Sequence, residues 1–264
     1  MASFTAKDVQ ALRRLTGAGM LDAKRALEAT DGDMEKARLW LREKGLATAA
    51  RLADREASQG AVALAVTGRA AAIMELRCET DFVAKAESFV NLTDELAQLV
   101  AEHGERAVAE RAAAIDDLRT TLKENISAGQ VVRFEIGADS VVGTYLHMQS
   151  GRGVNAVLVE MHGGTEELAH DVAVHVAFAR PTYLRRGDVP AEDVEAERAT
   201  VERISRNEGK PEAALPKITE GRMNGWFKER VLLEQPYARD EKRTIAEVVQ
   251  GAEIVRFAQV VVGN

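Results

Sequence analysis

Cysteine, proline and aromatic residues are scarce in this chain. Its 264 residues include a single cysteine, Cys78, and five prolines, and aromatic side chains make up 5%. One cysteine excludes an internal disulfide framework and is typical of proteins in a reducing compartment, so we expect a cytoplasmic protein. Because many of the apolar positions are alanine, the composition favours helices and close packing.

Long apolar runs and an excess of positive charge are also missing. No stretch approaches the roughly 20 apolar residues that a membrane-spanning helix needs, and the opening MASFTAKDVQ lacks the apolar core of a secretion signal. The formal net charge is −7, whereas a broad nucleic-acid footprint needs clustered cations. We therefore expect no membrane and no direct nucleic-acid partner.

Residues 1–46 have the pattern of a small three-helix module. Thr5 and Asp8 have the spacing of a capping box, two short glycine-containing stretches separate three helical patterns, and the third helix is expected to stop at Gly45. Residues 47–59 are rich in alanine and charge without a wide apolar face, and we interpret them as a partly helical linker.

From Gly60 the hydrophobic period becomes that of strands. Alternation on both sides of a Thr-Gly-Arg turn predicts a β-hairpin, and further elements follow along the chain. We expect helices over 86–103, 107–126 and 166–179, and strands over 131–136, 141–148, 154–161 and 253–262.

A charged segment, residues 190–228, has only a thin apolar seam that includes Val201 and Ile204. Such a surface cannot be core, so we expect a projecting, coiled-coil-like helical hairpin. The order of elements, without repeated strand–helix–strand units, predicts an α+β fold with antiparallel sheets. We assign 60–138 to one core subdomain and 139–189 with 229–264 to a second, into which the hairpin is inserted.

The sequence contains no recognisable set of catalytic residues. Gly17-Ala18-Gly19 follows a helix and completes no phosphate-binding motif, so a turn between helices is the better interpretation. The five histidines lack the spacing of a zinc site, His175 fits a packed position, and Cys78 fits a small buried residue at a strand end. We expect no catalytic residue, metal or cofactor.

The stretch Glu75–Lys85 is the most informative. A strand ends at Cys78, and Thr80 and Asp81 are good capping residues for the helix that follows. Phe82, one of only seven phenylalanines, comes next. Two interpretations stay open here: a helix cap followed by a core phenylalanine, or an aromatic ring and a carboxylate presented together to a partner.

Two long segments resemble the signatures of the elongation factor Ts family. The first is Leu12–Leu27 (LRRLTGAGMLDAKRAL) and the second is Glu75–Lys85 (ELRCETDFVAK). Shorter matches follow in the same order along the chain, at Glu124-Asn125-Ile126, Tyr145-Leu146-His147 and Glu220-Gly221-Arg222-Met223. The resemblance covers essentially the whole chain.

This resemblance implies a guanine-nucleotide exchange factor for the translational GTPase elongation factor Tu, acting in the elongation phase of protein synthesis. It implies a ubiquitin-associated-like N-terminal module and a two-part core that both grip the partner. The matched loop that disturbs the partner's magnesium site is Thr80, Asp81, Phe82 and Val83, and further matched partner contacts are Met20, Lys24 and His147. Arg77 departs from the family's usual asparagine, and contacts made by a C-terminal extension in some relatives are not carried over.

Two other functions compete with this one. A helical adaptor would bind a peptide through the first 45 residues and dimerise through the hairpin, without exchange activity. A small-molecule enzyme would have its site near Gly151-Arg152-Gly153 and His147, but the sequence offers no base–nucleophile pair for it. Self-association through the core or the hairpin is left open by the sequence.

Overall fold

The computed structural model describes residues 4–52 and 55–263, with the backbone alone for 46–51. It divides into two compact units, one of Met1–Phe134, His147–Val154 and Val260–Asn264, the other of Glu135–Leu146 and Asn155–Gln259. Helices and antiparallel strands are mixed, which confirms the α+β class. The predicted subdomain boundaries stay predictions.

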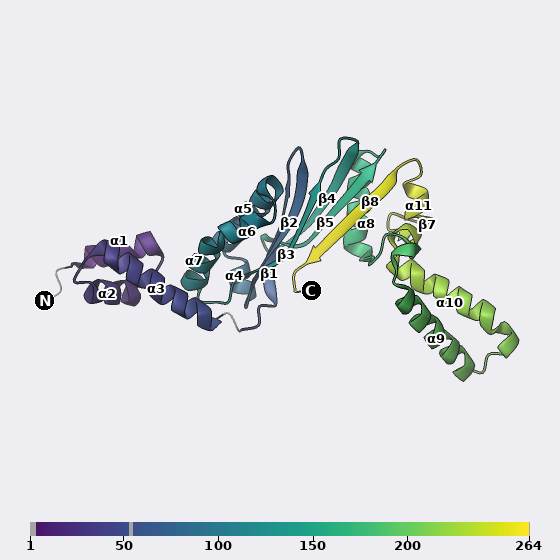
Figure 1. Cartoon of the computed structure of the whole chain (residues 1–264), viewed down its shortest axis with the longest axis horizontal. Helices are drawn as coiled ribbons and strands as arrows, with labels where there is room; N and C mark the ends of the chain where they lie inside the picture. The colour runs from purple at the N-terminus through teal and green to yellow at the C-terminus, as the bar shows by residue number, and fades with distance from the viewer. Residues whose placement is uncertain (1–3, 53–54, 264) are drawn as a thin grey trace. The chain divides into compact units, whose positions relative to one another are not determined.

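The N-terminal module consists of α1 (Ala6–Thr16), α2 (Met20–Ala29) and α3 (Met34–Leu52) (Figure 1). The predicted capping interaction is confirmed, because Asp8 Oδ2 accepts hydrogen bonds from the N–H of Thr5 at 2.7 Å and from its hydroxyl at 2.8 Å. A small apolar core holds the three helices together, formed by Val9, Leu12, Ala23, Ala26, Leu27 and Ala37.

The end of α3 corrects the sequence prediction. The helix passes through a buried Gly45 and enters the segment interpreted as a linker, ending at Leu52. A helical glycine costs only about 1 kcal/mol relative to alanine, and the alanine-rich residues that follow favour continuation. Part of the predicted linker, residues 53–54, lies outside the described residues.

The first sheet has the order β1-β2-β3 and is covered by α5 (Figure 1). The predicted hairpin is confirmed, with Ala63 opposite Met74 in an antiparallel register. Alanines of β1 alternate into a core in which Phe89 and Leu96 of α5 are fully buried, so small strand residues let the helix approach closely. The elements are β1 (Gln59–Val66), β2 (Ala70–Cys78), β3 (Ser127–Glu135), α4 (Asp81–Ala84) and α5 (Glu87–His103).

The single helix expected over 107–126 is wrong in two respects. It is broken at Arg111 into α6 (Arg106–Glu110) and α7 (Ala112–Leu122). It also ends four residues early, because Lys123 adopts the left-handed conformation at φ 61°. The chain then turns into β3.

The second sheet has the order β4-β5-β8, and α8 packs on it through a shared core (Figure 1). Val157 and Val159 of β5 meet Val172 and Val176 of α8 in that core, as the predicted helical stripe requires. A small two-stranded sheet and a short helix were not predicted. The elements are β4 (Ser140–Gln149), β5 (Arg152–His162), α8 (Glu166–Ala179), β6 (Pro236–Tyr237), β7 (Asp240–Thr244), α11 (Ile245–Val248) and β8 (Glu253–Val261).

His175 of α8 is a packed histidine, as predicted. Its Nδ1 accepts a hydrogen bond from the N–H of Ala238 at 3.2 Å, so Nε2 carries the proton and donates to Gln235 Oε1 at 3.0 Å. Burial holds the pKa of His175 below its ordinary value. Both ring nitrogens of His175 are therefore hydrogen-bonded within the protein.

The helical hairpin consists of α9 (Ala191–Asn207) and α10 (Leu215–Arg230). Its apolar seam contains Val201, as predicted, together with Met223 and Phe227. Ile204 was expected in that seam and is 44% exposed, which corrects the prediction. Three short 3₁₀ turns flank these helices, at Arg186–Asp188, Glu212–Ala214 and Leu232–Glu234.

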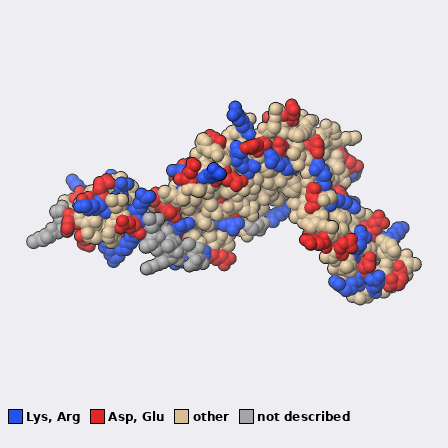
Figure 2. All heavy atoms as spheres, in the orientation of Figure 1, with Lys and Arg blue, Asp and Glu red and all other residues tan. Residues whose placement is uncertain are grey.

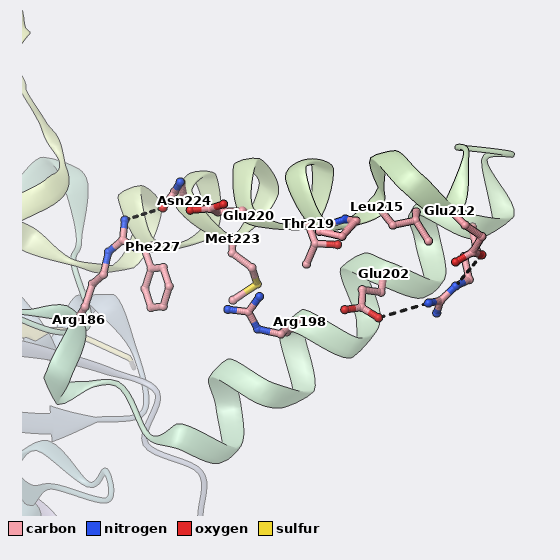
Figure 3. Close-up of a pocket in the computed structure, with 12 residues that line it drawn as sticks. Arg186, Arg198, Glu202, Glu212, Leu215, Thr219, Glu220, Met223, Asn224 and Phe227 are labelled. Atoms are coloured by element: carbon pink, nitrogen blue, oxygen red, sulfur yellow. Dashed lines mark hydrogen bonds and ion pairs between the residues drawn. The ribbon is translucent and has the colours of Figure 1, made fainter.

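A groove of about 500 Å³ runs along the hairpin between α9 and α10 (Figure 3). Its apolar floor includes Met223 and Phe227, and charged side chains of both signs, among them Arg198 and Glu220, line its walls. Arg186 stacks over the Phe227 ring at 4.4 Å from the ring centroid. The lining residues, all within the described part of the chain, include no histidine, cysteine or serine.

Candidate partner-binding loop

After β2 ends at Cys78 the chain turns sharply and begins α4. Thr80 is the N-cap of this helix, and its Oγ1 accepts a hydrogen bond from the N–H of Val83 at 3.4 Å. The helix is only four residues long, Asp81–Ala84, and Ala84 is its one buried residue. The cap predicted from the sequence is therefore present.

Phe82 points out of this turn into solvent. Its exposed fraction is 82%, the largest of the exposed large hydrophobic residues in the described part of the chain. The interpretation of Phe82 as a core residue is therefore wrong. A solvated phenylalanine on a capped turn is the kind of side chain that anchors protein–protein interfaces.

Asp81, beside Phe82, forms an ion pair within the same turn. Its Oδ2 lies 2.5 Å from Lys85 Nζ, and this hydrogen bond holds the pKa of Asp81 below its ordinary value. Both side chains are more than a third exposed, so water screens the pair. The Asp81 carboxylate is consequently ionised at neutral pH and accessible to a partner.

Glu124 braces the turn by accepting three hydrogen bonds from it. One carboxylate oxygen accepts hydrogen bonds from the N–H groups of Glu79 and Thr80, each at 3.0 Å, and the other accepts from the Thr80 hydroxyl at 2.5 Å. In the sequence, Glu124 stands out only as part of the short family match Glu124-Asn125-Ile126. A contact across 44 residues leaves no local pattern from which it could have been found.

Cys78 also contacts the turn, through a hydrogen bond from its thiol. It is buried at the end of β2, as predicted, and its thiol donates to the carbonyl oxygen of Thr80 with Sγ at 3.2 Å. Burial, followed by the nearby negative charge of Glu124, raises the pKa of Cys78 to about 12. The thiol is thus a protonated hydrogen-bond donor that holds the loop, and it is unsuited to act as a nucleophile.

A buried ion pair lies in the strand that leads to the turn. Glu75 of β2 is fully buried, and its Oε2 accepts from Arg77 Nε and from the N–H of Gln130, both at 2.9 Å. Gly129 makes room for it, since a Cβ at that position would lie 2.1 Å from Glu75 Oε2. Arg77, the departure from the family pattern, therefore has a partner of opposite charge.

The other predicted partner contacts lie on different elements. Met20 and Lys24 are exposed on α2, where Lys24 pairs with Glu28 at 3.5 Å. His147 is exposed near the end of β4. Of the seven predicted residues, the four of the Thr80–Val83 loop are brought together by the turn, and the other three are separate surface positions.

The alternative enzyme site was expected near residues 151–153 and His147. Arg152 is buried, and its guanidinium donates to the carbonyl oxygen of Gly60. His147 lies exposed on β4. Within the described residues, no group of three or more histidine, cysteine or acidic side chains could hold a metal ion.

Charge on the surface is mixed. On the face shown in Figure 2, lysine and arginine alternate with aspartate and glutamate, and no broad basic area stands out. None of the described helices combines the length and apolar character that crossing a bilayer requires.

Comparison with known proteins gives a consistent family. The sequence pattern of the family described as Elongation factor TS matches residues 79–264. Elongation factor Ts of Clavibacter michiganensis is 45% identical over 277 residues, covering all of both chains, and that of Kineococcus radiotolerans is 44% identical over 96% of each. Elongation factor Ts of Micrococcus luteus is 42% identical, again over the full length of both. The chain therefore belongs to the elongation factor Ts family of translation elongation factors.

Proposed function

We propose that the chain is a guanine-nucleotide exchange factor that binds the GDP-bound GTPase elongation factor Tu and promotes release of GDP. The observation that supports this most directly is the solvated ring of Phe82 on a turn whose backbone is held from several sides. In this proposal the Thr80–Val83 loop inserts near the magnesium and phosphate site of the GTPase.

The mechanism needs binding energy and no catalytic group on this chain. A GTPase holds its nucleotide largely through a magnesium ion and a phosphate-cradling loop. A protein that binds the nucleotide-free state more tightly than the loaded state weakens nucleotide binding by the same factor, because the two equilibria are linked. An aromatic ring wedged between elements of the GTPase favours the state in which the magnesium ligands are displaced.

Asp81 contributes a negative charge at the same place. Its carboxylate is ionised and held by Lys85 across one turn of α4. On contact with the GTPase, the carboxylate can exchange Lys85 for polar groups that otherwise surround the magnesium ion. Since the Asp81–Lys85 pair is exposed, separating it costs little.

Met20, Lys24 and His147 supply the remaining contacts in this proposal. Met20 is 48% exposed, and Leu15 and Leu21 in the same module are 70% and 69% exposed. Exposed apolar side chains on a module with a core this small are consistent with a binding surface. His147 adds a polar contact from β4.

The release rate of a fluorescent GDP from elongation factor Tu tests the proposal. Burying a phenylalanine side chain contributes about 1.5–3 kcal/mol, so Phe82→Ala is expected to slow stimulated release by roughly 10- to 100-fold. The fold should be unaffected, since the ring is 82% exposed.

Phe178→Ala is the matched control. Phe178 is 78% exposed near the end of α8, so this variant loses an equally solvated ring from a different surface. It should stimulate release like the unaltered chain. Equal release rates for Phe82→Ala and Phe178→Ala would refute the role assigned to the loop.

A further inference from the structure

The loop that presents Phe82 has little stability of its own. A four-residue helix fixes more backbone dihedral angles than its hydrogen bonds offset, so α4 requires support from outside. Phe82 gives none, because its ring does not pack into the core. Its orientation in the free protein is therefore set by the two ends of α4, by the packing of the buried Ala84 in the core and by the hydrogen bonds at Thr80.

Glu124 makes three hydrogen bonds to the start of the turn. Its carboxylate accepts from the N–H groups of Glu79 and Thr80 and from the Thr80 hydroxyl. Because the hydroxyl hydrogen is donated to Glu124, the lone pairs of Thr80 Oγ1 are left to accept from the N–H of Val83. One carboxylate thus fixes both the start of α4 and the direction of its capping group.

The support is reciprocal. Glu79 Oε1 accepts from the N–H of Asn125 at 2.7 Å, so each of the two segments donates backbone hydrogen bonds to an acidic side chain of the other. Asn125 Nδ2 in turn donates to the carbonyl oxygen of Arg55 at 2.7 Å. Glu124 is therefore held in a network that restricts it to this position, and hydrogen bonds to a charged acceptor are among the stronger ones.

We propose that Glu124 is a positioning residue for exchange: it holds the Thr80 turn in one conformation, so that Phe82 meets the partner already oriented. This inference rests on the proposed function of the loop. A binding segment that is ordered before contact avoids the entropic cost of becoming ordered at the interface. Loss of the Glu124 hydrogen bonds therefore weakens the stimulation of GDP release by Phe82, although the ring itself is still present.

A double-mutant cycle on stimulated GDP release tests this assignment. Loss of the charge-assisted hydrogen bonds in Glu124→Ala should slow the maximal release rate about tenfold. If Glu124 acts through Phe82, the double variant Glu124→Ala/Phe82→Ala should be no slower than Phe82→Ala alone. Glu124→Gln, which keeps an acceptor but loses the charge, should fall between Glu124→Ala and the unaltered chain.

Asp117→Ala is the matched control, because it removes an exposed carboxylate from the preceding helix α7. It should leave the release rate unchanged. A second readout needs no partner: amide hydrogen exchange at Glu79 and Thr80 should accelerate in Glu124→Ala and Glu124→Gln and stay slow in Asp117→Ala. If Glu124→Ala does not fold, the same cycle with Glu124→Gln decides.

The outcomes distinguish failure of the proposed function of the loop from failure of the positioning role of Glu124. If Phe82→Ala leaves release unchanged, the proposed function of the loop fails, and the positioning role fails with it. If Phe82→Ala slows release while Glu124→Ala does not, or if the two effects multiply in the double variant, the positioning role alone is overturned.

Discussion

The buried Glu75–Arg77 pair offers a direct test of what supports the strand leading to the loop. Glu75 is fully buried, and its Oε2 is satisfied by Arg77 Nε and the N–H of Gln130, while its Oε1 has no hydrogen-bond partner among the described residues. We consider Arg77→Met, which keeps an apolar stem but removes the charge, and Glu75→Gln, which keeps the shape but neutralises the carboxylate.

The structure sets the expected magnitudes. Removing one member of a buried ion pair typically costs 3–5 kcal/mol, because a charge is left uncompensated. The Arg77 side chain is 32% exposed, so water screens part of the pair, and we expect about 2 kcal/mol for Arg77→Met. Glu75→Gln loses the charge but retains an acceptor for Gln130, and should cost about 1 kcal/mol.

The double variant distinguishes electrostatics from packing. With the carboxylate neutralised, the loss of Arg77 leaves no buried charge, so Glu75→Gln/Arg77→Met should be more stable than Arg77→Met alone. Amide hydrogen exchange of strand β2 is the suitable assay, since it reports the opening of the unit that contains the pair. As a control, Arg69→Met at the exposed β1–β2 turn should change stability by less than about 0.5 kcal/mol.

An additive result would refute this reasoning. If the double variant is less stable than Arg77→Met by the full cost of Glu75→Gln, then Arg77 contributes by packing alone. The pair would then not explain how this chain accommodates an arginine in β2.

Three further outcomes follow from the geometry. In Gly143→Ala, the new Cβ would lie 2.0 Å from the carbonyl carbon of Ala169, so β4 and α8 must separate, and urea titration should show a loss of about 3 kcal/mol. Burial lowers the pKa of His175 in the folded state, so the unfolded chain binds this proton first as the pH falls below about 6.5. The free energy of unfolding should therefore decrease from pH 7.5 to pH 5. In His175→Leu this decrease should be less steep. Cys78, with a pKa near 12, should react with a thiol reagent only after denaturation, and rapid reaction of the folded protein would contradict its burial.

Elements with strong periodicity were predictable from the sequence. The stripe of α8 and the alternation in the β1–β2 hairpin gave the observed elements closely. Gly45 misled the prediction of α3, because a glycine can either end a helix or lie buried within one. Neighbouring sequence does not distinguish the two.

The end of α7 and the arrangement of the loop depended on distant contacts. Residues 123–126 continue the helical pattern, yet Lys123 turns the chain, and Glu124 then bonds to the backbone of Thr80. The local sequence allowed Phe82 to be a core residue or an exposed one, and only the folded chain decides between them. The sequence predicts the loop as a partner contact, but the hydrogen bonds that Glu124 makes to it could not be predicted.

The proposed function is that this chain promotes release of GDP from elongation factor Tu by binding to it. The most direct measurement is the rate at which a fluorescent GDP leaves purified elongation factor Tu, mixed by stopped flow with increasing concentrations of the full chain. We expect a rate that rises with concentration to a plateau, and a complex of the two proteins that dissociates when excess GDP is added. A release rate equal to the spontaneous one at every concentration would show that the chain has no exchange activity.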